Sequence, residues 1–465
     1  MKKLLFVFFI LATGLYLKAQ KFEWAVNFGG NIQWGKNMKT DKKGNIYHIG
    51  TFRGTLDFDP GIGIYNLTSL PNSSAMFILK LDKKGNFVWA KSIDKIQGNA
   101  LDIDAYGNLY ITGYFTNTTS DFDPGSGVYN LKSKAGSDMF VVKLNEDGEF
   151  VWAKSLGGPK ADQGESIEID SDNNICISGI YGGKVDFDMG VDSFYINSNA
   201  SNGNFDIFIL KLNENGDFIW VKSIGDGLEQ KSTFTIATDS SNNICIGGQF
   251  TGDIDFNPEP EVFNLTTSPG EFDVFLLKLD ENGDFIWVKS IQTKGRISIT
   301  FDSKSDLYLT GGIENNLNLD TSLSLTSNGS YDILILKLNK YGDFIWAKNF
   351  GGLNFDYGTA IMNDYYNNVY ITGAFNGTVD FDPDKGHFNL ISKGKQDVFI
   401  LKLNETGDFI WVKSIGGLKY DGGYNITLDL VNNIFVSGEF SDTVDFDPGP
   451  DTFNLISQGS SDIFI

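Results

Sequence analysis

A tryptophan recurs at nearly even intervals along this chain of 465 residues. The gaps between its copies are 65, 63, 68, 67, 59 and 65 residues, and the copies stand at Trp24, Trp89, Trp152, Trp220, Trp287, Trp346 and Trp411. The surrounding phrase is best preserved as Gly-Asp-Phe-Ile-Trp-Val-Lys-Ser, at the fourth, fifth and seventh copies. A fixed period of this kind indicates one supersecondary unit copied along the chain. The repeat therefore overrides the two or three ordinary domains that the length alone would allow.

Each copy contains four segments with the pattern of β-strands. The first alternates polar and apolar residues and ends in Asp, as in residues 165–170. The second follows a tight Asp-x-x-Gly/Asn-Asn turn, in which Gly or Asn tolerates positive φ. The third, such as residues 208–212, is apolar on both faces, and the fourth carries the tryptophan. Cys176 and Cys245 fall at a second-strand position and predict buried packing, while the lysines of the third and fourth strands are expected to snorkel at blade edges.

Four-stranded sheets that stack face to face around an axis form a β-propeller. Residues 21–30 match an isolated fourth strand, and residues 461–465 match the start of a third strand, so their pairing would close a ring and protect the sheet edges. The sequence predicts an all-β, seven-bladed propeller with four antiparallel strands per blade and the last blade closed by the N-terminal strand. The expected blades, in one domain of residues 20–465, are 31–94, 95–157, 158–225, 226–292, 293–351, 352–416 and 417–465 with 20–30.

Three phrases carry a family resemblance: residues 104–113 (Asp-x-x-Gly-Asn-x-Tyr-Ile-Thr-Gly), the third-strand Asp-x-Phe-Ile-Leu-Lys-Leu, and residues 152–158 (Trp-Ala-Lys-Ser-x-Gly-Gly). They resemble the SBBP β-propeller repeat family, in the version with Asp-Phe-Asp-Pro inserts that exported proteins of Bacteroidetes-type bacteria contain. The resemblance covers residues 21–465. It implies the propeller fold, and it implies no enzymatic activity and lends no catalytic residues.

The N-terminal stretch has the composition of a secretory signal peptide. Lys2 and Lys3 precede an apolar run from Leu4 to about Leu17, and a small residue, Ala19, marks the expected cleavage point of a leader spanning residues 1–19. No other apolar run approaches the length of a transmembrane helix. The formal charge of −22 disfavours nucleic acid and anionic lipid as partners. We expect an exported monomer, located outside the cell or on its outer surface, with the periplasm as an alternative.

The long connections between second and third strands share an Asp-Phe-Asp-Pro core. Two carboxylates at i and i+2 in an extended segment project to one side, and Ca²⁺ prefers oxygen ligands. Calcium is the one cofactor considered, against the alternative that Phe fills a gap while Asp and Pro shape the turn. The candidate metal ligands are Asp57, Asp59, Asp121, Asp123, Asp186, Asp188, Asp255, Asp380, Asp382, Asp445 and Asp447.

The links between blades contain a second group of carboxylates, in which Gly-Gly precedes Asp162, Asp356 and Asp421. They either line the central channel or bond backbone N–H groups in a turn, and the turn is the preferred reading. Aromatic residues of the long connections, such as Tyr65, Tyr129, Tyr195 and Phe263, are candidate sugar platforms or packing for the inserts.

Enzyme chemistry finds little support in the sequence. A sialidase needs an arginine cluster, and the chain has two Arg, Arg53 and Arg296. Serine or cysteine catalysis needs a His base, and His48 and His387 have no suggestive partner. The prediction is a non-enzymatic binding or scaffold module for an extracellular glycan or protein. The alternative is a propeller glycoside hydrolase that acts on a neutral polysaccharide through paired carboxylates.

Overall fold

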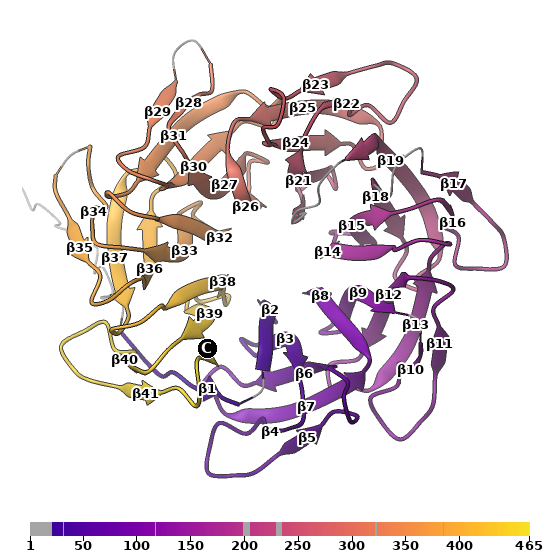
Figure 1. Cartoon of the computed structure of the whole chain (residues 1–465), viewed down its shortest axis with the longest axis horizontal. Coiled ribbons are helices and arrows are strands. Elements are labelled where there is room, and N and C mark those ends of the chain that lie inside the picture. Colours follow the sequence, from indigo (N-terminus) through magenta and orange to yellow (C-terminus); the bar gives the residue numbers. More distant parts are fainter. Residues whose placement is uncertain are drawn as a thin grey trace, which may run out of the picture.

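The computed structural model describes residues 21–30, 32–116, 118–198, 205–228, 235–320, 323–384 and 386–465. The predicted signal peptide lies outside the described residues. Figure 1 shows seven sheets arranged around a central axis, and within the described ranges every regular element is a strand. No described segment forms a helix long and apolar enough to span a membrane. The predicted all-β seven-bladed fold is confirmed.

Each of the seven large sheets has four strands, and we number the blades 1 to 7 in chain order. From the axis outward, the strands are β2 (Ile32–Thr40), β3 (Ile46–Phe52), β6 (Ala75–Leu81), β7 (Phe87–Asp94); β8 (Ile96–Ile103), β9 (Leu109–Thr116), β12 (Ser137–Leu144), β13 (Phe150–Leu156); β14 (Gln163–Ile169), β15 (Ile175–Tyr181), β18 (Phe205–Leu212), β19 (Phe218–Leu228); β20 (Thr235–Thr238), β21 (Ile244–Phe250), β24 (Asp273–Leu279), β25 (Phe285–Ile291); β26 (Lys294–Phe301), β27 (Leu307–Ile313), β30 (Asp332–Leu338), β31 (Phe344–Phe350); β32 (Tyr357–Asn363), β33 (Val369–Phe375), β36 (Asp397–Leu403), β37 (Phe409–Ile415); β38 (Gly422–Leu428), β39 (Ile434–Phe440), β42 (Asp462–Phe464), β1 (Asn27–Phe28).

Each connection between second and third strands folds into a small hairpin at the rim of the ring (Figure 1). The seven hairpins are β4 (Thr55–Asp57) with β5 (Asn66–Thr68), β10 (Thr119–Asp121) with β11 (Asn130–Lys132), β16 (Lys184–Asp186) with β17 (Tyr195–Asn197), β22 (Asp253–Asp255) with β23 (Asn264–Thr266), β28 (Asn316–Asn318) with β29 (Ser324–Thr326), β34 (Thr378–Asp380) with β35 (Asn389–Ile391), and β40 (Thr443–Asp445) with β41 (Asn454–Ile456).

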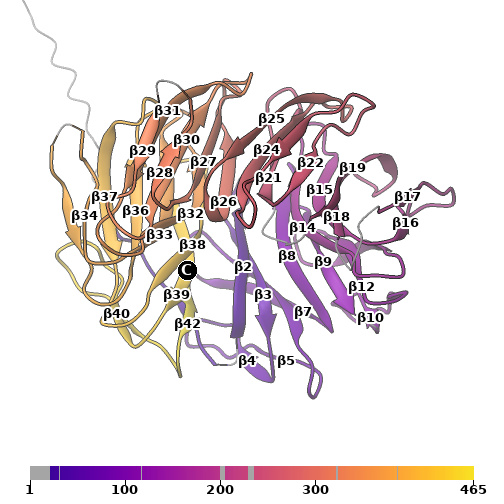
Figure 2. The same ribbon diagram turned by 45° about the horizontal axis from the view of Figure 1, so that its top comes forward.

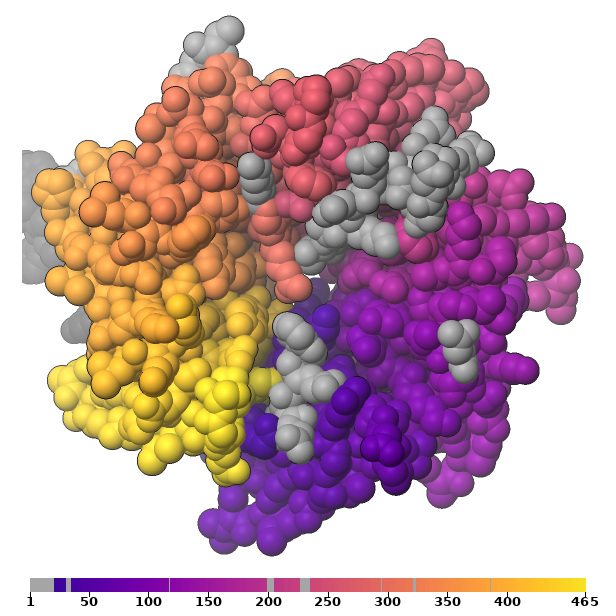
Figure 3. Space-filling view, viewed as in Figure 1, coloured from indigo at the N-terminus to yellow at the C-terminus, as the bar shows by residue number. Residues whose placement is uncertain are grey.

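The two ends of the chain close the ring in blade 7. β1 pairs with β42 in antiparallel register, with Asn27 opposite Phe464 and Phe28 opposite Ile463. Val26 and Ile465 extend the ladder, because each backbone N–H donates to the other residue's carbonyl at 3.0 Å. The indigo and yellow segments accordingly lie side by side in Figures 2 and 3. The predicted closure by the N-terminal strand is confirmed.

One aspartate organises the first turn of each blade. In blade 1, Asp41 Oδ1 accepts hydrogen bonds from the backbone N–H groups of Lys43 and Asn45 at 2.8 and 2.9 Å. Its Oδ2 accepts the Asn45 side-chain amide at 2.7 Å. Gly44 has a φ of 82°, and Asn173 takes the same left-handed conformation in blade 3 at 63°. These residue types recur at the turn because they tolerate positive φ better than other residues do.

The third-strand lysines of blades 1 to 5 are buried, and Lys402 of blade 6 is largely buried, so the expectation that these lysines snorkel at a blade edge is wrong. Lys278 is 1% exposed, and its Nζ lies 2.8 Å from Asp239 Oδ2 in the first turn of the same blade. In blade 3, Lys211 lies 2.9 Å from Asp170 and also donates to the Glu281 carbonyl of blade 4 at 3.3 Å. A buried ammonium requires a counter-charge and acceptors, and the turn aspartate supplies the charge.

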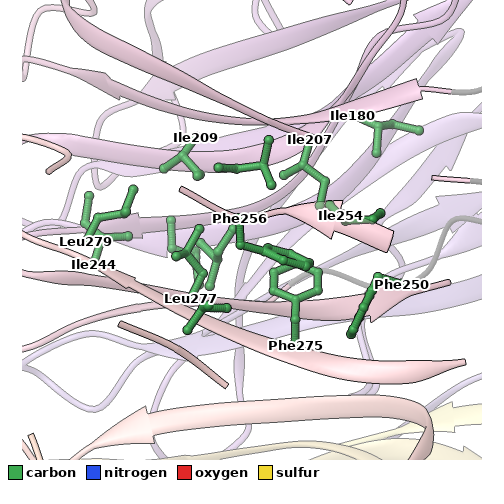
Figure 4. Packing of buried hydrophobic residues seen from close by; sticks show 14 of the residues in the cluster. Ile180, Ile207, Ile209, Ile244, Phe250, Ile254, Phe256, Phe275, Leu277 and Leu279 are labelled. Carbon is green, nitrogen blue, oxygen red and sulfur yellow. The ribbon is translucent and has the colours of Figure 1, made fainter. Parts of the chain in front are cut away.

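The apolar core is divided into seven clusters, each shared by two neighbouring blades. Figure 4 shows the cluster between blades 3 and 4, where Ile207 and Ile209 face Leu277. The hairpin residue Phe256 enters this cluster, fully buried, with its ring 4.7 Å from that of Phe275. The hairpin phenylalanine is therefore a core residue, as the packing alternative predicted. Cys176 belongs to the same cluster, and both cysteines are buried and unbridged, as expected.

The repeated tryptophan packs against the next blade. In blade 4, the Trp287 indole N–H donates to the Lys340 carbonyl of blade 5 at 3.1 Å, and a Cβ added to Gly342 would lie 2.9 Å from the indole. The Gly at this turn is needed because no larger residue fits under the ring. The same indole-on-glycine contact joins Trp24 to Gly85, Trp89 to Gly148, Trp152 to Gly216, Trp220 to Gly283 and Trp346 to Gly407.

We predict that Trp287→Ala lowers the free energy of unfolding by about 3–5 kcal/mol, because it removes a buried ring and its hydrogen bond from an interface between blades. Urea denaturation followed by circular dichroism measures the change. Ile286→Ala is the matched control, since that neighbouring side chain is 39% exposed and its removal is expected to cost under about 1 kcal/mol. Equal losses in the two variants would contradict the role of Trp287 in blade stacking.

Candidate functional site

The first aspartate of each rim hairpin fixes the hairpin by bonding its backbone. Asp57 Oδ1 accepts the N–H groups of Asp59 at 3.0 Å and Tyr65 at 2.8 Å. The second of these bonds, which spans eight residues, recurs at 2.7–2.9 Å in five further hairpins, at Asp121, Asp186, Asp255, Asp380 and Asp445. One oxygen of the first aspartate in each of these six hairpins is thus committed to the turn.

The second aspartate serves the hairpin tip. Asp59 Oδ1 accepts the N–H of Gly61 at 2.8 Å, and Asp123, Asp188 and Asp447 make the equivalent bond. In blade 6, it is the carbonyl of Asp382 that accepts an N–H, from Gly386. Within the described residues, no three acidic, His or Cys side chains gather as a metal site. The turn accounts for this motif without a metal, and calcium binding stays a prediction.

The aromatic residues of the hairpins pack against the outer strand of their own blade. The ring centroids of Tyr65 and Phe87 are 4.8 Å apart, as are those of Tyr129 and Phe150. Phe263 packs on Phe285 in the same way, at 5.4 Å. In blade 3, Phe194 makes this contact with Phe218, and Tyr195 remains 57% exposed. The position equivalent to Tyr65 and Tyr129 in blade 3 is therefore Phe194, one residue before the predicted Tyr195.

The carboxylates of the blade links bond backbone, as the preferred reading predicted. Asp162 is fully buried, and its two oxygens accept the N–H groups of Gly158 at 2.7 Å and Gly182 at 3.0 Å. Asp356 and Asp421 make the same pair of bonds in blades 6 and 7. Burial raises the pKa of Asp162 to about 7 despite these bonds. These residues hold blade links and do not line the channel.

The central channel contains a charged cluster built from three inner strands. Lys39 on β2 lies 3.1 Å from Asp102 on β8 and 3.3 Å from Glu168 on β14. The three residues occupy one position of the repeat, two residues before the first-turn aspartate of blades 1, 2 and 3. Burial raises the pKa of Glu168 to about 7, and Asp102 adds to the shift while Lys39 opposes it. One ammonium thus serves two carboxylates.

A second charged group begins three residues earlier on two of these strands, at Lys36 on β2 and Glu165 on β14. Glu165 on β14 interacts electrostatically with Lys36 on β2 and Arg296 on β26, which belong to blades 1 and 5. Such an interaction between non-adjacent blades occurs only across the channel. Burial raises the pKa of Glu165 to about 7, although both cations oppose the shift. Burial and the charge of Arg296 lower the pKa of Lys36.

Tyrosines and a further acid border this group. The Tyr424 hydroxyl of blade 7 donates to Glu439 Oε2 at 3.1 Å, and burial raises the pKa of Tyr424, with Glu439 and Tyr357 contributing. Tyr114 of blade 2 donates to Gln97 at 2.7 Å. The channel therefore presents cations, carboxylates and phenol groups to one space. This set can bind a polar, uncharged molecule through many hydrogen bonds.

The sequence contained a signal for the channel cluster that the reading by repeats missed. At the position of Lys39, Asp102 and Glu168, the other blades carry Ala237, Thr300, Met362 and Thr427. The preceding position is apolar in all seven copies, whereas this position varies and in blades 1 to 3 carries the charges of the channel cluster. Residues that vary inside a conserved phrase were the available clue.

Comparisons with known proteins support a repeat propeller and no narrower family. No model of a known protein family matches the chain. It is 25% identical over 505 residues to an uncharacterized WD repeat-containing protein of Acanthamoeba polyphaga mimivirus, covering 90% of this chain and 36% of that protein. It is 24% identical over 249 residues to the regulatory protein FlaEY of Caulobacter vibrioides, covering 52% of this chain and 24% of that protein. The chain thus spans about a third and a quarter of the length of these two relatives.

Solved structures with similar chains include a protein of unknown function from Bacteroides caccae, with a TM-score of 0.38, 11% identity, and coverage of 84% of this chain and 93% of that one. A member of the DUF4221 family from Bacteroides vulgatus has a TM-score of 0.31 at 11% identity, covering 84% and 97%. TM-scores this low support no conclusion about the function of this chain. The SBBP resemblance is not confirmed and stays a prediction.

We predict that the protein loses stability as the pH rises from 5 to 8. A carboxyl group whose pKa is raised on folding stabilises the folded state below its unfolded pKa, and this contribution is lost as the pH passes the folded pKa. For Glu165 the folded pKa is about 7 and the ordinary value 4.5, so the loss falls within this range and amounts to roughly 1–3 kcal/mol. Urea titrations at pH 5, 6.5 and 8 measure it. Glu165→Gln is expected to reduce the pH dependence by the share of Glu165, since Asp162 and Glu168 keep theirs, and an unchanged profile in that variant would contradict the assignment.

We also predict that millimolar Ca²⁺ raises the thermal midpoint, since a ligand that binds only the folded state stabilises it by mass action. The double variant Asp57→Asn with Asp59→Asn should lose part of the gain, because Asn keeps the Oδ1 acceptor and removes the charge. Differential scanning fluorimetry with Ca²⁺, with Mg²⁺ and with a chelator provides the measurement. A midpoint that does not respond to Ca²⁺ would leave these aspartates with the turn-forming role alone.

Proposed function

We propose that the protein is a non-enzymatic, exported or cell-surface propeller that acts as a binding module, with the ligand held in the central channel. The partner that these residues suit best is a neutral glycan, and a protein loop with polar side chains is the second choice. The observation that carries the proposal is the ion-pair network in which Lys39 of blade 1 lies 3.1 Å from Asp102 of blade 2 and 3.3 Å from Glu168 of blade 3. The residue type at this repeat position differs between blades, and the charged residues of blades 1, 2 and 3 meet there.

The chemistry of the channel favours a neutral ligand over a charged one. Positive and negative groups alternate there, so an anionic or cationic ligand would meet like charges as well as opposite ones. Hydroxyl-rich ligands both donate and accept hydrogen bonds, and the carboxylates, Arg296 and the phenols of Tyr357 and Tyr424 offer both functions. The chain's net formal charge of −22 further disfavours anionic partners.

One observation favours glycoside hydrolysis as the alternative function. Glycosidases need a carboxylic acid that stays protonated near neutral pH and a second carboxylate near the scissile bond. Glu165 has a pKa raised to about 7, and Glu439 is a further acid at the channel. The binding function remains our first choice, because Glu439 is already hydrogen-bonded to Tyr424 and Ser461.

We predict that the protein binds neutral oligosaccharides on a glycan array, with and without Ca²⁺, and that Arg296→Ala weakens binding by about tenfold, which corresponds to one lost charge-assisted hydrogen bond. Lys348→Ala is the matched control: Lys348 stands on β31, the outermost strand of the blade that carries Arg296, and pairs with Asp384. Titration calorimetry on the best glycan quantifies both variants.

The same glycans, incubated with the protein and analysed for released reducing ends, test the alternative. Hydrolysis that Glu165→Gln abolishes would replace the binding function by a glycosidase. Equal effects of the Lys348 and Arg296 variants would contradict a ligand position in the channel. An array without any glycan signal would leave a protein as the proposed partner.

A further inference from the structure

The interface between blades 1 and 2 lacks a buried carboxylate that every other blade supplies. Near the start of the third strand, blades 2 to 7 carry an aspartate that is at most 8% exposed, namely Asp138, Asp206, Asp273, Asp332, Asp397 and Asp462. Blade 1 carries Ala75 at this position. Asp138 lies against Gly157, where an added Cβ would be 2.3 Å from its Cγ. Ala75 lies opposite Asp94 instead, so the side chain of Asp94 accounts for the small residue.

The link between the same two blades is a single residue, Lys95, which has a φ of 64°. The links into blades 3, 6 and 7 are six residues long and end in a buried aspartate. In blade 3 this is Asp162, whose carboxylate accepts the Gly182 N–H at 3.0 Å, and blades 6 and 7 make the same bond. In blade 2, Ile96 and Thr116 stand at the positions of Asp162 and Gly182. The short link therefore removes a second carboxylate from this interface.

A polar cavity of about 350 Å³ lies between blades 1 and 2 at this place. Within the described residues, its lining contains two cations, Arg53 and Lys95, and no carboxylate. Gln97 and Tyr114 of blade 2 close its inner side. Further hydroxyl and amide groups come from Asn72, Ser73, Ser74, Thr116 and Thr118. Small-molecule sites in proteins measure roughly 300–1,000 Å³, so this cavity suits a ligand of monosaccharide size.

Both cations are exposed and available to an anion. Arg53 Nε donates to Ser74 Oγ at 2.9 Å, which holds the guanidinium at the cavity wall. The backbone N–H of Lys95 donates to the Ser74 carbonyl at 2.9 Å, so one residue anchors both cations. Among the described residues, neither cation pairs with a carboxylate. The neighbouring Asp94 uses Oδ1 to accept the Leu70 N–H at 2.8 Å and does not line the cavity.

These groups select a carboxylate that also carries hydroxyl groups. A guanidinium presents paired N–H donors that match the two oxygens of a carboxylate, and an ammonium adds a second charge. Thr116 stands where Gly182 donates to a carboxylate in blade 3, so the backbone at this place suits the same group. Serine, threonine and tyrosine hydroxyls both donate and accept, as sugar hydroxyls do. The net charge of −22 is screened beyond about 8 Å at physiological salt, so the two local cations dominate inside the cavity.

We propose that the cavity between blades 1 and 2 binds a sugar acid of monosaccharide size, a hexuronate. Its carboxylate lies between Arg53 and Lys95, and its hydroxyl groups bond the serine, threonine and tyrosine side chains of the wall. This site goes beyond the binding function proposed for the central channel and does not depend on the ligand there, because its two cations are not part of the channel cluster.

The test uses titration calorimetry on the full chain with D-glucuronate, D-glucose and acetate. Glucuronate should bind with one molecule per chain and at least about tenfold more tightly than either of the others, because glucose lacks the charge and acetate lacks the hydroxyl groups. Equal affinity for glucuronate and glucose, or no binding of glucuronate, would overturn the proposal. Acetate that binds as tightly as glucuronate would overturn the recognition of a sugar.

Two variants of the protein locate the site. Arg53→Gln and Lys95→Gly should each weaken glucuronate binding by about tenfold, and glycine tolerates the positive φ at position 95, so the fold is kept. Lys419→Gln is the matched control: it removes an exposed lysine from the longer link into blade 7, which ends in Asp421 and retains its carboxylate. Its affinity for glucuronate should stay unchanged, with thermal midpoints showing that all three variants are folded. Equal losses in the Arg53 and Lys419 variants would overturn the site.

Discussion

The indole-on-glycine contact between neighbouring blades sets the spacing on which the rest of the ring depends. An added Cβ at Gly85 would lie 2.7 Å from the Trp24 ring, and the corresponding distance from Gly148 to Trp89 is 3.0 Å, so the two blades approach until no side chain fits between them. This approach brings the inner faces close enough to share one apolar cluster per interface. Stability in such a ring is approximately a sum over pairs of neighbouring blades. The pairing of β1 with β42 completes the sheet of blade 7, and blade 7 then shares an apolar cluster with blade 1.

The sequence predicted what repeats and missed what does not. The spacing of the tryptophans gave the number of blades, and the alternating patterns gave the strands, because both arise from contacts made again in each copy. The lysines of the third strand were misjudged, since their counter-charge lies about 35–40 residues away, as Lys278 and Asp239 show. Tyr195 was placed one residue out of register, because Phe194 takes the packing position that a tyrosine takes in blades 1 and 2.

The channel cluster escaped prediction for a geometric reason. Lys39 and Glu168 are 129 residues apart in the chain and stand in blades 1 and 3, yet their charged atoms lie 3.3 Å apart. Inner-strand side chains that turn toward the axis can meet those of any other blade, whereas inner-strand residues such as Met38 and Leu101 pack against one neighbouring blade. When the repeats are compared in sequence, Lys39, Asp102 and Glu168 are three unrelated residues at one variable position. In the folded chain they form a single ion-pair network, and the low dielectric constant of their partly buried surroundings strengthens each charge–charge interaction.

The channel and the closure of the ring are mechanically linked through the inner strands of blades 1 and 7. Thr40 on β2 and Thr427 on β38 share a hydrogen bond of 2.9 Å, and the Asn425 amide donates to the Lys36 carbonyl at 3.4 Å. Lys36 is also one of the channel cations. Opening of the seam between blades 7 and 1 would therefore displace Lys36 from Glu165. A ligand that contacts blades 1, 3 and 5 together binds only the closed arrangement, and by mass action it stabilises the ring at a seam that it does not touch.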